Sequence, residues 1–274
     1  MPSVPTHPRH APCFARRRRV LATIGAGSLL LMAPGTILAE AWRRFDTVRN
    51  AVGDATVSEN GLDLSLPLVA EDGSAVPLTI TSILPADAPR IQRLSIFASG
   101  NPTPEVAQFE FGPEVPSIKL STRIRLSESQ TVFIVAHTED GDALVTQRDV
   151  RVTTSGCVAP AQAPAASAEM NARVRIPEAW QPDAEGEIIT MITHPMTTGL
   201  AQDASGNTPP QRIIKTFEVS LDDRSLLRAT FFRSLAANPY LRFDASPQQS
   251  GVMRFVWTED TGRAVEETAP VRLA

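Results

Sequence analysis

Apolar and polar residues alternate along short runs through most of the chain, and this period of two restricts the possible folds more than any other feature. The clearest run covers residues 118–126, where two sets of side chains interleave: Ile118, Leu120, Ile124 and Leu126 against Lys119, Ser121, Arg123 and Arg125. Successive side chains of a strand point to opposite faces of a sheet. The run therefore predicts a β-strand with one buried face.

Comparable runs recur at short intervals and are separated by turns rich in Gly, Pro and Asp. We expect strands in the first half at residues 62–66, 78–80, 94–96, 109–111, 118–126, 132–136 and 143–152. In the second half we expect them at residues 174–176, 187–193, 213–221, 226–232, 241–245, 252–258 and 265–273. The one expected helix is a short amphipathic segment, residues 42–52, with Trp42, Phe45 and Val48 near one face. This pattern predicts an all-β protein.

A stretch rich in Ala, Pro, Ser and Gln, residues 158–168, divides the strands into two groups. We therefore expect two tandem immunoglobulin-like antiparallel β-sandwiches, at residues 42–152 and 171–274, joined by an Ala/Pro-rich linker within residues 153–170. The two groups end alike, with the acidic turns Thr138-Glu139-Asp140-Gly141 and Thr258-Glu259-Asp260-Thr261-Gly262. This similarity is consistent with two related domains, although hairpin turns converge on such residues.

The first 41 residues have the pattern of a secretory signal peptide. Four arginines, Arg16 to Arg19, precede a weakly apolar run, and Ala39-Glu40-Ala41 follows as a cleavage pattern. Arginines before a Gly-containing apolar run favour the twin-arginine export route, although Val20 stands where that signal usually has Phe. A membrane anchor is the alternative, since the run is about long enough to cross a bilayer. We expect cleavage near Ala41, a periplasmic protein, and no membrane association afterwards.

The charge of the mature chain argues against a nucleic-acid-binding role. Removal of the signal leaves 21 basic and 29 acidic residues, because five of the 26 basic residues and one of the 30 acidic residues lie in it. The resulting net charge of 21 − 29 = −8 lacks the basic footprint that nucleic acids need. It favours partners with basic surfaces.

Cleavage also removes Cys13 and leaves Cys157 as the sole thiol. Cys157 follows Ser155 and Gly156, two small residues, so we expect the sulfur to be exposed and its backbone to be flexible. A lone cysteine in a linker without function is the plain alternative. In an oxidising compartment, however, a single leftover cysteine suggests a reactive thiol or an intermolecular pair. We expect a reactive thiol on a mobile arm, and a monomer able to form a dimer linked through Cys157.

The remaining residues give weak signals for other chemistry. His194 and Met196 are the only plausible soft-metal ligands, and two ligands from one loop are too few for a site. His137 falls on a predicted strand, where a structural role is expected. The sequence contains no CxxC pair and no Gly-rich phosphate loop. We therefore expect neither a cofactor nor catalysis within this chain.

Several motifs resemble SoxYZ, the sulfur-carrier complex of bacterial thiosulfate oxidation, with both subunits fused. Residues 42–152 resemble SoxY in Leu62-Asp63-Leu64, Glu71-Asp72-Gly73, Gly100-Asn101-Pro102-Thr103-Pro104-Glu105-Val106-Ala107 and Ser121-Thr122-Arg123-Ile124-Arg125-Leu126. Residues 171–274 resemble SoxZ in Ile192-Thr193-His194-Pro195-Met196-Thr197-Thr198-Gly199, Ala237-Asn238-Pro239-Tyr240-Leu241-Arg242-Phe243 and Trp257-Thr258-Glu259-Asp260. The single-chain form is also similar to carriers associated with quinoprotein dehydrogenases.

The resemblance implies a role for Cys157. The family carries sulfur intermediates covalently on one cysteine in a Gly-Gly-Cys-Gly-Gly tail, and Cys157 is the matching residue here. Val158 and Ala159 replace the glycines that follow it, and the arm is tethered at both ends. The implied function is a periplasmic carrier that presents sulfur to sulfur-oxidation enzymes or to a quinoprotein dehydrogenase system. The alternatives are a non-covalent binding or chaperone module serving such a dehydrogenase, and a metal-delivery protein using His194 and Met196.

Overall fold

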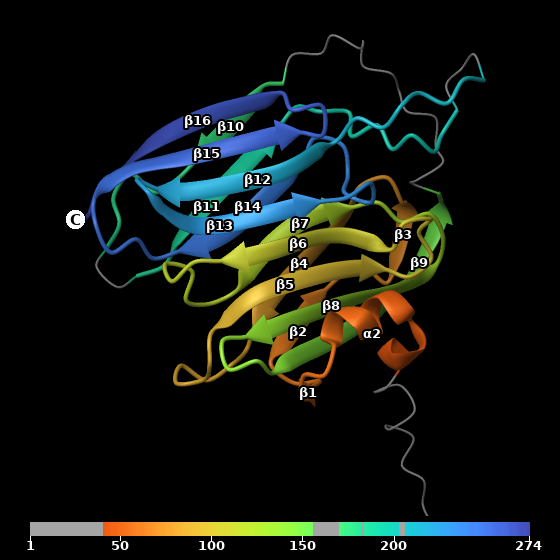
Figure 1. Cartoon of the computed structure of the whole chain (residues 1–274), viewed down its shortest axis with the longest axis horizontal. Helices are drawn as coiled ribbons and strands as arrows, with labels where there is room; N and C mark the ends of the chain where they lie inside the picture. Colours follow the sequence, from red (N-terminus) through yellow and green to blue (C-terminus); the bar gives the residue numbers. More distant parts are fainter. Residues whose placement is uncertain (1–40, 156–169, 182–183, 203–205) are drawn as a thin grey trace, which may run out of the picture. The chain divides into compact units, whose positions relative to one another are not determined.

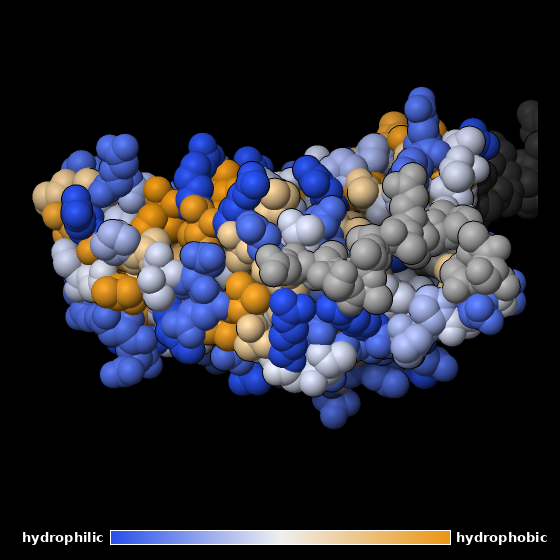
Figure 2. All heavy atoms as spheres, turned by 90° about the horizontal axis from the view of Figure 1, so that it is seen from above, coloured by the Kyte–Doolittle hydropathy of each residue, from blue (hydrophilic) through white to orange (hydrophobic). Residues whose placement is uncertain are grey.

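The computed structural model describes residues 41–155, 170–181, 184–202 and 206–274 (Figure 1). Within these ranges, no helix is both long enough and apolar enough to cross a membrane. One face of the surface is shown in Figure 2, where polar and charged side chains surround smaller apolar areas.

The expected helix is present at the start of the described chain. A 3-10 turn, η1 (Ala41–Arg44), precedes the α-helix α2 (Asp46–Val52). Trp42, Val48 and Val52 are buried in a small apolar cluster that also contains Phe133 of the neighbouring sheet. The helix ends at Val52, and the following Gly53 has a positive φ of 61°, a conformation that glycine adopts without strain.

The expected strands are confirmed in both halves. The first half contains β1 (Val57–Ser58), β2 (Leu62–Ser65), β3 (Val69–Asp72), β4 (Val76–Ser82), β5 (Ile91–Ala98), β6 (Glu105–Phe111), β7 (Lys119–Ile124), β8 (Gln130–Thr138) and β9 (Ala143–Thr154). The second half contains β10 (Ala172–Arg175), β11 (Gly186–Ile192), β12 (Ile214–Leu221), β13 (Arg224–Phe231), β14 (Tyr240–Ala245), β15 (Gly251–Glu259) and β16 (Ala264–Val271). The short strands β1 and β3 are additional to the expectation.

The two halves join by strand pairing, which the alternation pattern does not predict. One sheet has the order β1-β9-β8-β5-β6-β13-β12-β15-β16, with β3 beside β9, and the other has the order β10-β11-β14-β7-β4-β2. Strand β6 of the first half pairs antiparallel with β13 of the second, from Ala107–Phe231 to Phe111–Leu227. Strand β7 pairs in the same way with β14. The two sandwiches therefore share both of their sheets.

The strand orders are symmetric about these two joins. In the larger sheet β6, β5, β8 and β9 on one side correspond to β13, β12, β15 and β16 on the other, and in the smaller sheet β7, β4 and β2 correspond to β14, β11 and β10. The acidic turns are equivalent as well, because Glu139 N–H donates to Arg90 O and Asp260 N–H donates to Ile213 O, both at 2.9 Å. The sequence similarity aligns Glu139 with Glu259. These hydrogen bonds instead align Glu139 with Asp260, the next residue.

One apolar cluster lies between the two sheets and runs through both halves. Phe109 of β6 meets Phe231 of β13 edge to face at 6.3 Å between ring centroids, across the join. Phe217 and Trp257 stack at 4.7 Å deeper in the second half. Since buried aromatic side chains dominate core energetics, the join is part of the core of the protein.

Candidate functional site

Strand β9 ends at Thr154 and is followed by Ser155, the last described residue before the expected arm. Ser155 is half-buried. Gly156 and Cys157, the other two residues of the predicted site, lie outside the described residues. The structure therefore defines the base of the arm.

The end of β9 is held on both sides. On one side β3 runs parallel to it, with Val69 opposite Arg151 and Asp72 opposite Thr154. Gly73 N–H donates to Thr154 O at 2.8 Å, so the pairing continues to the last strand residue. On the other side Val152 N–H donates to Ser129 Oγ at 3.0 Å. The arm thus starts from a fixed point of the sheet.

A buried amide network holds the loop that contains Ser129. Asn101, from the motif Gly100–Ala107, is 5% exposed and donates from Nδ2 to Arg125 O at 2.8 Å. Its Oδ1 accepts from Ser127 N–H and from Gln130 Nε2, both at 2.9 Å. Gln130 Oε1 in turn accepts from Gly100 N–H at 2.7 Å. Because buried polar groups are costly when unpaired, this network fixes the loop beside the arm base.

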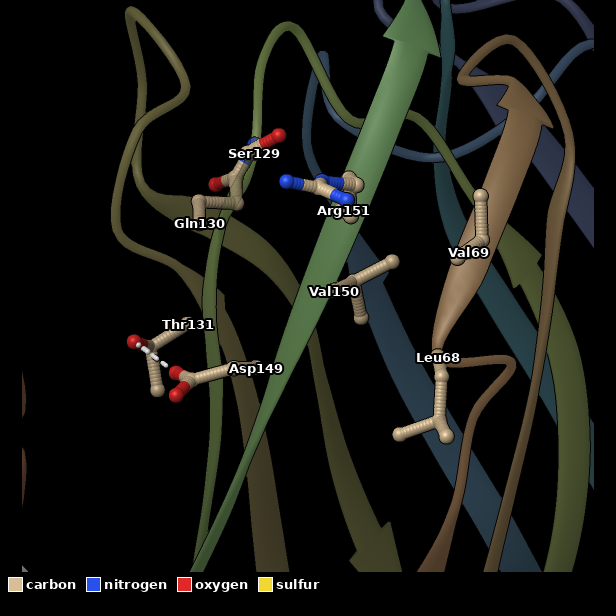
Figure 3. A pocket seen from close by; sticks show the side chains of 8 residues that line it. All are labelled: Leu68, Val69, Ser129, Gln130, Thr131, Asp149, Val150 and Arg151. Atoms are coloured by element: carbon tan, nitrogen blue, oxygen red, sulfur yellow. Dashed lines mark hydrogen bonds between the residues drawn. The ribbon is translucent and has the colours of Figure 1, made fainter.

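A groove of about 610 Å³ lies along the last part of β9 (Figure 3). Its lining residues come from the start of β3, the start of β8 and β9 itself: Leu68, Val69, Ser129, Gln130, Thr131, Asp149, Val150 and Arg151. Asp149 accepts a hydrogen bond from Thr131 Oγ1 at 2.6 Å. Leu68 and Val69 are 74% and 52% exposed, so the groove has an apolar rim.

Several acidic side chains lie on the elements that flank β9. Glu71 and Asp72 on β3 and Glu128 in the loop before β8 are exposed, as is Asp149 in the groove. Hydrogen bonds from the backbone N–H and hydroxyl of Ser74 lower the pKa of Asp72, which keeps this carboxylate charged. The exposed side chains near the arm base and the groove therefore include apolar groups, these carboxylates and the guanidinium groups of Arg148 and Arg151.

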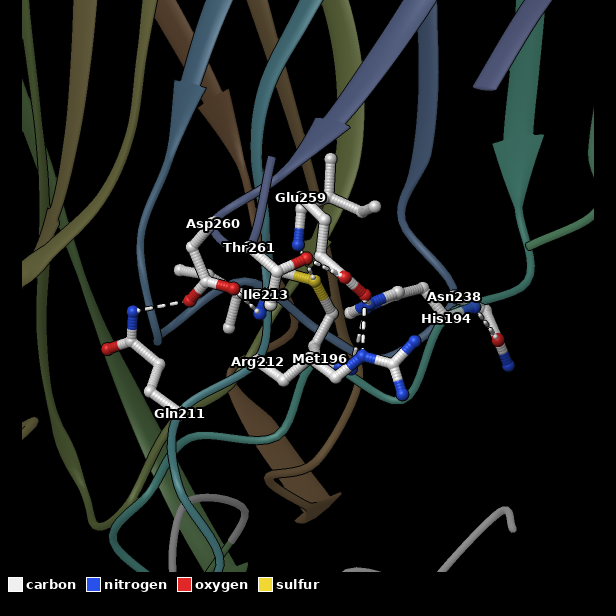
Figure 4. Close-up of polar contacts among 10 residues, drawn as sticks. His194, Met196, Gln211, Arg212, Ile213, Asn238, Glu259, Asp260 and Thr261 are labelled. Carbon is white, nitrogen blue, oxygen red and sulfur yellow. Dashed lines mark hydrogen bonds and ion pairs between the residues drawn. The ribbon is translucent and has the colours of Figure 1, made fainter. Parts of the chain in front are cut away.

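The two weak metal candidates lie in a buried hydrogen-bond cluster of the second half (Figure 4). The His194 side chain is 0% exposed, and its Nδ1 accepts Met196 N–H at 3.0 Å. The ring proton is therefore on Nε2, which lies 2.8 Å from Glu259 Oε1 and donates to it. Burial lowers the pKa of His194 more than the Glu259 contact raises it, so the ring is neutral.

Glu259 is the centre of this cluster. Its Oε1 also accepts from Arg212 Nε at 2.6 Å, and its Oε2 accepts from the hydroxyl of Thr261. Burial alone would raise the pKa of Glu259, but the bonds from Thr261, His194 and Arg212 together lower it. The carboxylate is thus charged and paired, as a buried charge requires.

Met196 has a structural place in the same turn. It is fully buried at a positive φ of 48°, and its sulfur accepts Ile214 N–H at 3.2 Å. Both nitrogens of His194 and the sulfur of Met196 therefore have hydrogen-bond partners. In the parts of the chain that the structure describes, no group of three or more His, Cys, Asp or Glu residues is placed to hold a metal ion. His137 lies half-buried on β8, where burial and the charge of Arg93 lower the pKa of its imidazole.

The motifs of the two halves meet near the arm. Arg125, at the end of the motif Ser121–Leu126, donates from Nη2 to Pro195 O at 3.1 Å. Thr122 Oγ1 donates to Tyr240 O at 2.8 Å, between the same motif and Ala237–Phe243. The far end of the arm returns here too, since Thr193 N–H donates to Asn171 O at 2.9 Å.

The fold defines a protein with two immunoglobulin-like β-domains in one chain. Residues 48–157 match the family model of sulfur oxidation protein SoxY, and residues 174–270 match that of sulphur oxidation protein SoxZ. The chain belongs to the SoxYZ family of sulfur-oxidation carriers, with both subunits fused.

No curated protein matches the chain. Among solved structures it is similar to a beta-glucuronidase from glycoside hydrolase family 2, with 11% identity, a TM-score of 0.23, and coverage of 78% of this chain and 20% of that one. It is also similar to a beta-glycosidase from Bacteroides vulgatus, with 10% identity, a TM-score of 0.24, and coverage of 82% and 26%. The chain spans about a fifth to a quarter of the length of these structures.

Proposed function

We propose that this protein is a periplasmic carrier that holds sulfur intermediates covalently on Cys157 and presents them to partner enzymes. The observation that carries the proposal is the pair of SoxY and SoxZ matches in one chain, of which the SoxY match ends at residue 157. That residue is a cysteine, and the mature chain expected after signal cleavage has no other.

The chemistry of a thiol explains the need for partner enzymes. The thiolate, and not the thiol, reacts with sulfur compounds. An unperturbed thiol with a pKa of about 8.5 is ionised only to a few per cent at pH 7. The six residues before Cys157 include one cation, Arg151. A partner's active site would therefore supply the activation, and the chain would act as a carrier and not as an enzyme.

The base of the arm suits this role. The clamp by Gly73 and Ser129 holds β9 in the sheet to its end, so the arm starts from a defined place on the surface. A partner that recognises this surface would find the cysteine within a short search distance. The hydrogen bonds of His194 and Met196 favour a structural role for these residues over metal delivery.

The cellular setting of the proposal follows from the sequence. The pattern of Arg16 to Arg19, an apolar run and Ala39-Glu40-Ala41 supports export and a periplasmic location. The partners would be periplasmic sulfur-oxidation enzymes or a quinoprotein dehydrogenase system.

Intact-mass spectrometry of the protein purified from its own cells tests the proposal. A sulfur-containing adduct is expected on the wild-type chain and is expected to be absent from Cys157→Ser. Cys13→Ser is the matched control, because that residue lies in the expected signal and its loss should leave the adduct unchanged. An adduct that persists in Cys157→Ser would exclude the carrier function and favour the non-covalent binding module.

A further inference from the structure

The outward face of the smaller sheet carries a row of side chains that the core does not use. The registers place Arg173 of β10 opposite Met191 of β11, and Met191 opposite Tyr240 of β14. Arg123 of β7 continues the row beside Tyr240, with its guanidinium carbon 5.1 Å from the ring centroid. Because side chains alternate along a strand, this arginine row points away from the apolar cluster between the sheets.

The arginine row has the composition of a protein interface. Arg173 and Arg123 are exposed, and Met191 and Tyr240 between them are half-buried. Aromatic residues, Met and Arg are enriched in the centres of protein interfaces relative to the rest of the surface. The row crosses four strands, so its two arginines lie about 14 Å apart at a strand spacing of about 4.8 Å.

The other charges on this face cancel. Three carboxylates and three cations share it with the arginine row: Asp63, Glu187, Asp244, Lys119, Arg175 and Arg242. Glu187 contacts Arg175 at 3.1 Å and Arg242 at 3.4 Å. Asp244 contacts Lys119 at 3.3 Å. The exposed carboxylates of β3 belong to the other sheet. The excess charge of the face is therefore the two positive charges of the arginine row.

This charge selects among the occupants that the row could take. A second copy of this chain would bring the same two arginines, and in the described part of the face only Asp63 is a carboxylate outside an ion pair. Each of the four segments outside the described ranges contains a single acidic residue, so none supplies a carboxylate for both ends of the row. An anionic membrane would meet the carboxylates Asp63, Glu187 and Asp244 on the same face.

A protein surface with carboxylates around an apolar centre satisfies both arginines. We infer that the arginine row is a docking surface for an acidic partner protein. Carboxylates of the partner pair with Arg173 and Arg123, and an apolar side chain between them packs on Met191 and Tyr240. Strands β10, β11 and β14 belong to the second half and β7 to the first, so the surface is complete only when both halves are joined.

Photo-crosslinking of the full-length protein in its own cells tests this inference. The photoreactive amino acid p-benzoylphenylalanine is placed at position Met191, and mass spectrometry identifies the crosslinked protein and peptide. The matched control places it at Thr230, which is half-buried on β13 of the larger sheet. Arg123→Glu and Arg173→Glu reverse the charges of the row, and Arg228→Glu on β13 is their control. Because all three arginines are exposed, stability should change little.

We expect position 191, and not position 230, to crosslink to another protein through a peptide that contains Asp or Glu. Each reversal in the row should lower the crosslinking yield at least about fivefold, as for a contact at the centre of an interface, whereas Arg228→Glu should leave it unchanged. Changing the acidic residue of that peptide to Lys should restore crosslinking to Arg123→Glu or to Arg173→Glu. In a cell extract the yield should also fall as salt rises from about 50 to about 300 mM.

Other outcomes would overturn the docking surface. These are a crosslink to a second copy of this chain, to another segment of the same chain or to a peptide without acidic residues, and the absence of any crosslink. Equal yields from Arg123→Glu, Arg173→Glu and Arg228→Glu would overturn it as well. None of these results bears on a sulfur adduct at Cys157, so the docking surface and the carrier function can fail independently.

Discussion

Arg125 of the SoxY half holds the backbone carbonyl of Pro195 in the SoxZ half at 3.1 Å. The two residues belong to motifs that lie about 70 residues apart in the sequence. Pro195 lies between His194 and Met196 in the sequence. The contact therefore links Arg125, at the end of the motif Ser121–Leu126, to the buried hydrogen-bond cluster of His194 and Glu259. The fused chain therefore has a specific polar contact between domains beside the base of the arm.

Replacing Arg125 with Met should loosen the turn at residues 194–196. A hydrogen bond to a charged group contributes about 1.5–3 kcal/mol, so the free energy of unfolding should fall by that order. Hydrogen exchange at the Met196 amide should become faster, because the turn that holds it loses its anchor. Arg173→Met, at an exposed position of β10, is the control and should change neither quantity. Unchanged exchange at Met196 in Arg125→Met would show that the contact does not hold the turn.

The strand join at Gly112 should be sensitive to a single methyl group. A Cβ built at Gly112 would lie 2.1 Å from Ser225 O, where the end of β6 meets β13. Overpacking of this kind costs about 1–3 kcal/mol, so Gly112→Ala should weaken the join by that amount. After protease cleavage at a site inserted in the linker, the wild-type halves should stay together on gel filtration.

In the cleaved Gly112→Ala protein, the dissociation constant of the two halves should be about 5- to 150-fold higher than in wild type, so the halves should separate at a higher protein concentration. Gly262→Ala is a useful control, since its φ of 88° makes the substitution strained but nothing lies near its Cβ. It should lower the melting temperature without affecting association. Separation of the wild-type halves at micromolar concentration would contradict the importance of the strand join.

The His194 cluster should make the protein less stable in mild acid. Burial lowers the pKa of His194, so between its unfolded value of about 6.5 and its lower folded value the unfolded state binds more protons. The stabilisation is complete above pH ~6.5 and decreases as pH falls toward the folded value, by at most about 1.4 kcal/mol per pH unit. The lowered pKa of Glu259 adds a loss of the same sign at still lower pH.

Urea unfolding at several pH values between about 7.5 and about 5 measures this effect. His194→Gln should lose much of the slope, because no titrating group remains at that position. His137→Gln should keep the His194 contribution, which separates it from that of the half-buried His137, whose pKa is also lowered. Equal slopes in wild type and His194→Gln would show that His194 is not the group responsible.

The N-terminal pattern gives a prediction about export. The mature chain should begin near Trp42 and lack Cys13, which N-terminal sequencing of the periplasmic protein would show. Replacing Arg16 to Arg19 with Lys should block export if the twin-arginine route is used. A periplasmic protein that retains Cys13 would contradict cleavage at this site.

Several strands were predictable because apolar and polar residues alternate in them, although β8 is buried on both faces. In β7, for example, Leu120 and Ile124 are fully buried, whereas Lys119 and Arg123 are exposed. Strand β3 was missed because it is short and only Ala70 is buried in it. Its place is set by backbone pairing with β9, which leaves no signal in the side chains.

The shared sheets could not be predicted from the pattern either. Phe109 and Phe111 show the same alternation whether β6 is an edge strand or a central one. Gly112 is the one signal at this join, since its close approach to Ser225 excludes a side chain. Glycines also occur at bulges and tight bends of strands, so this signal alone is weak.

The sequence identified the candidate cysteine but not its surroundings. Leu68 and Val69 belong to no alternating run, and their exposure depends on where β3 lies. The sequence also did not reveal the hydrogen-bond partner of His194. That partner, Glu259, is 65 residues away in the motif Trp257–Asp260. Contacts over such distances follow from topology and not from local pattern.

The strand joins between β6 and β13 and between β7 and β14 also bear on how such a protein is made. Either half alone would expose two strand edges with unpaired N–H and C=O groups, and such edges promote aggregation. A single chain supplies both complementary edges in equal amounts and close together. Fusion would thus protect each domain from self-association during synthesis, independently of any effect on sulfur chemistry.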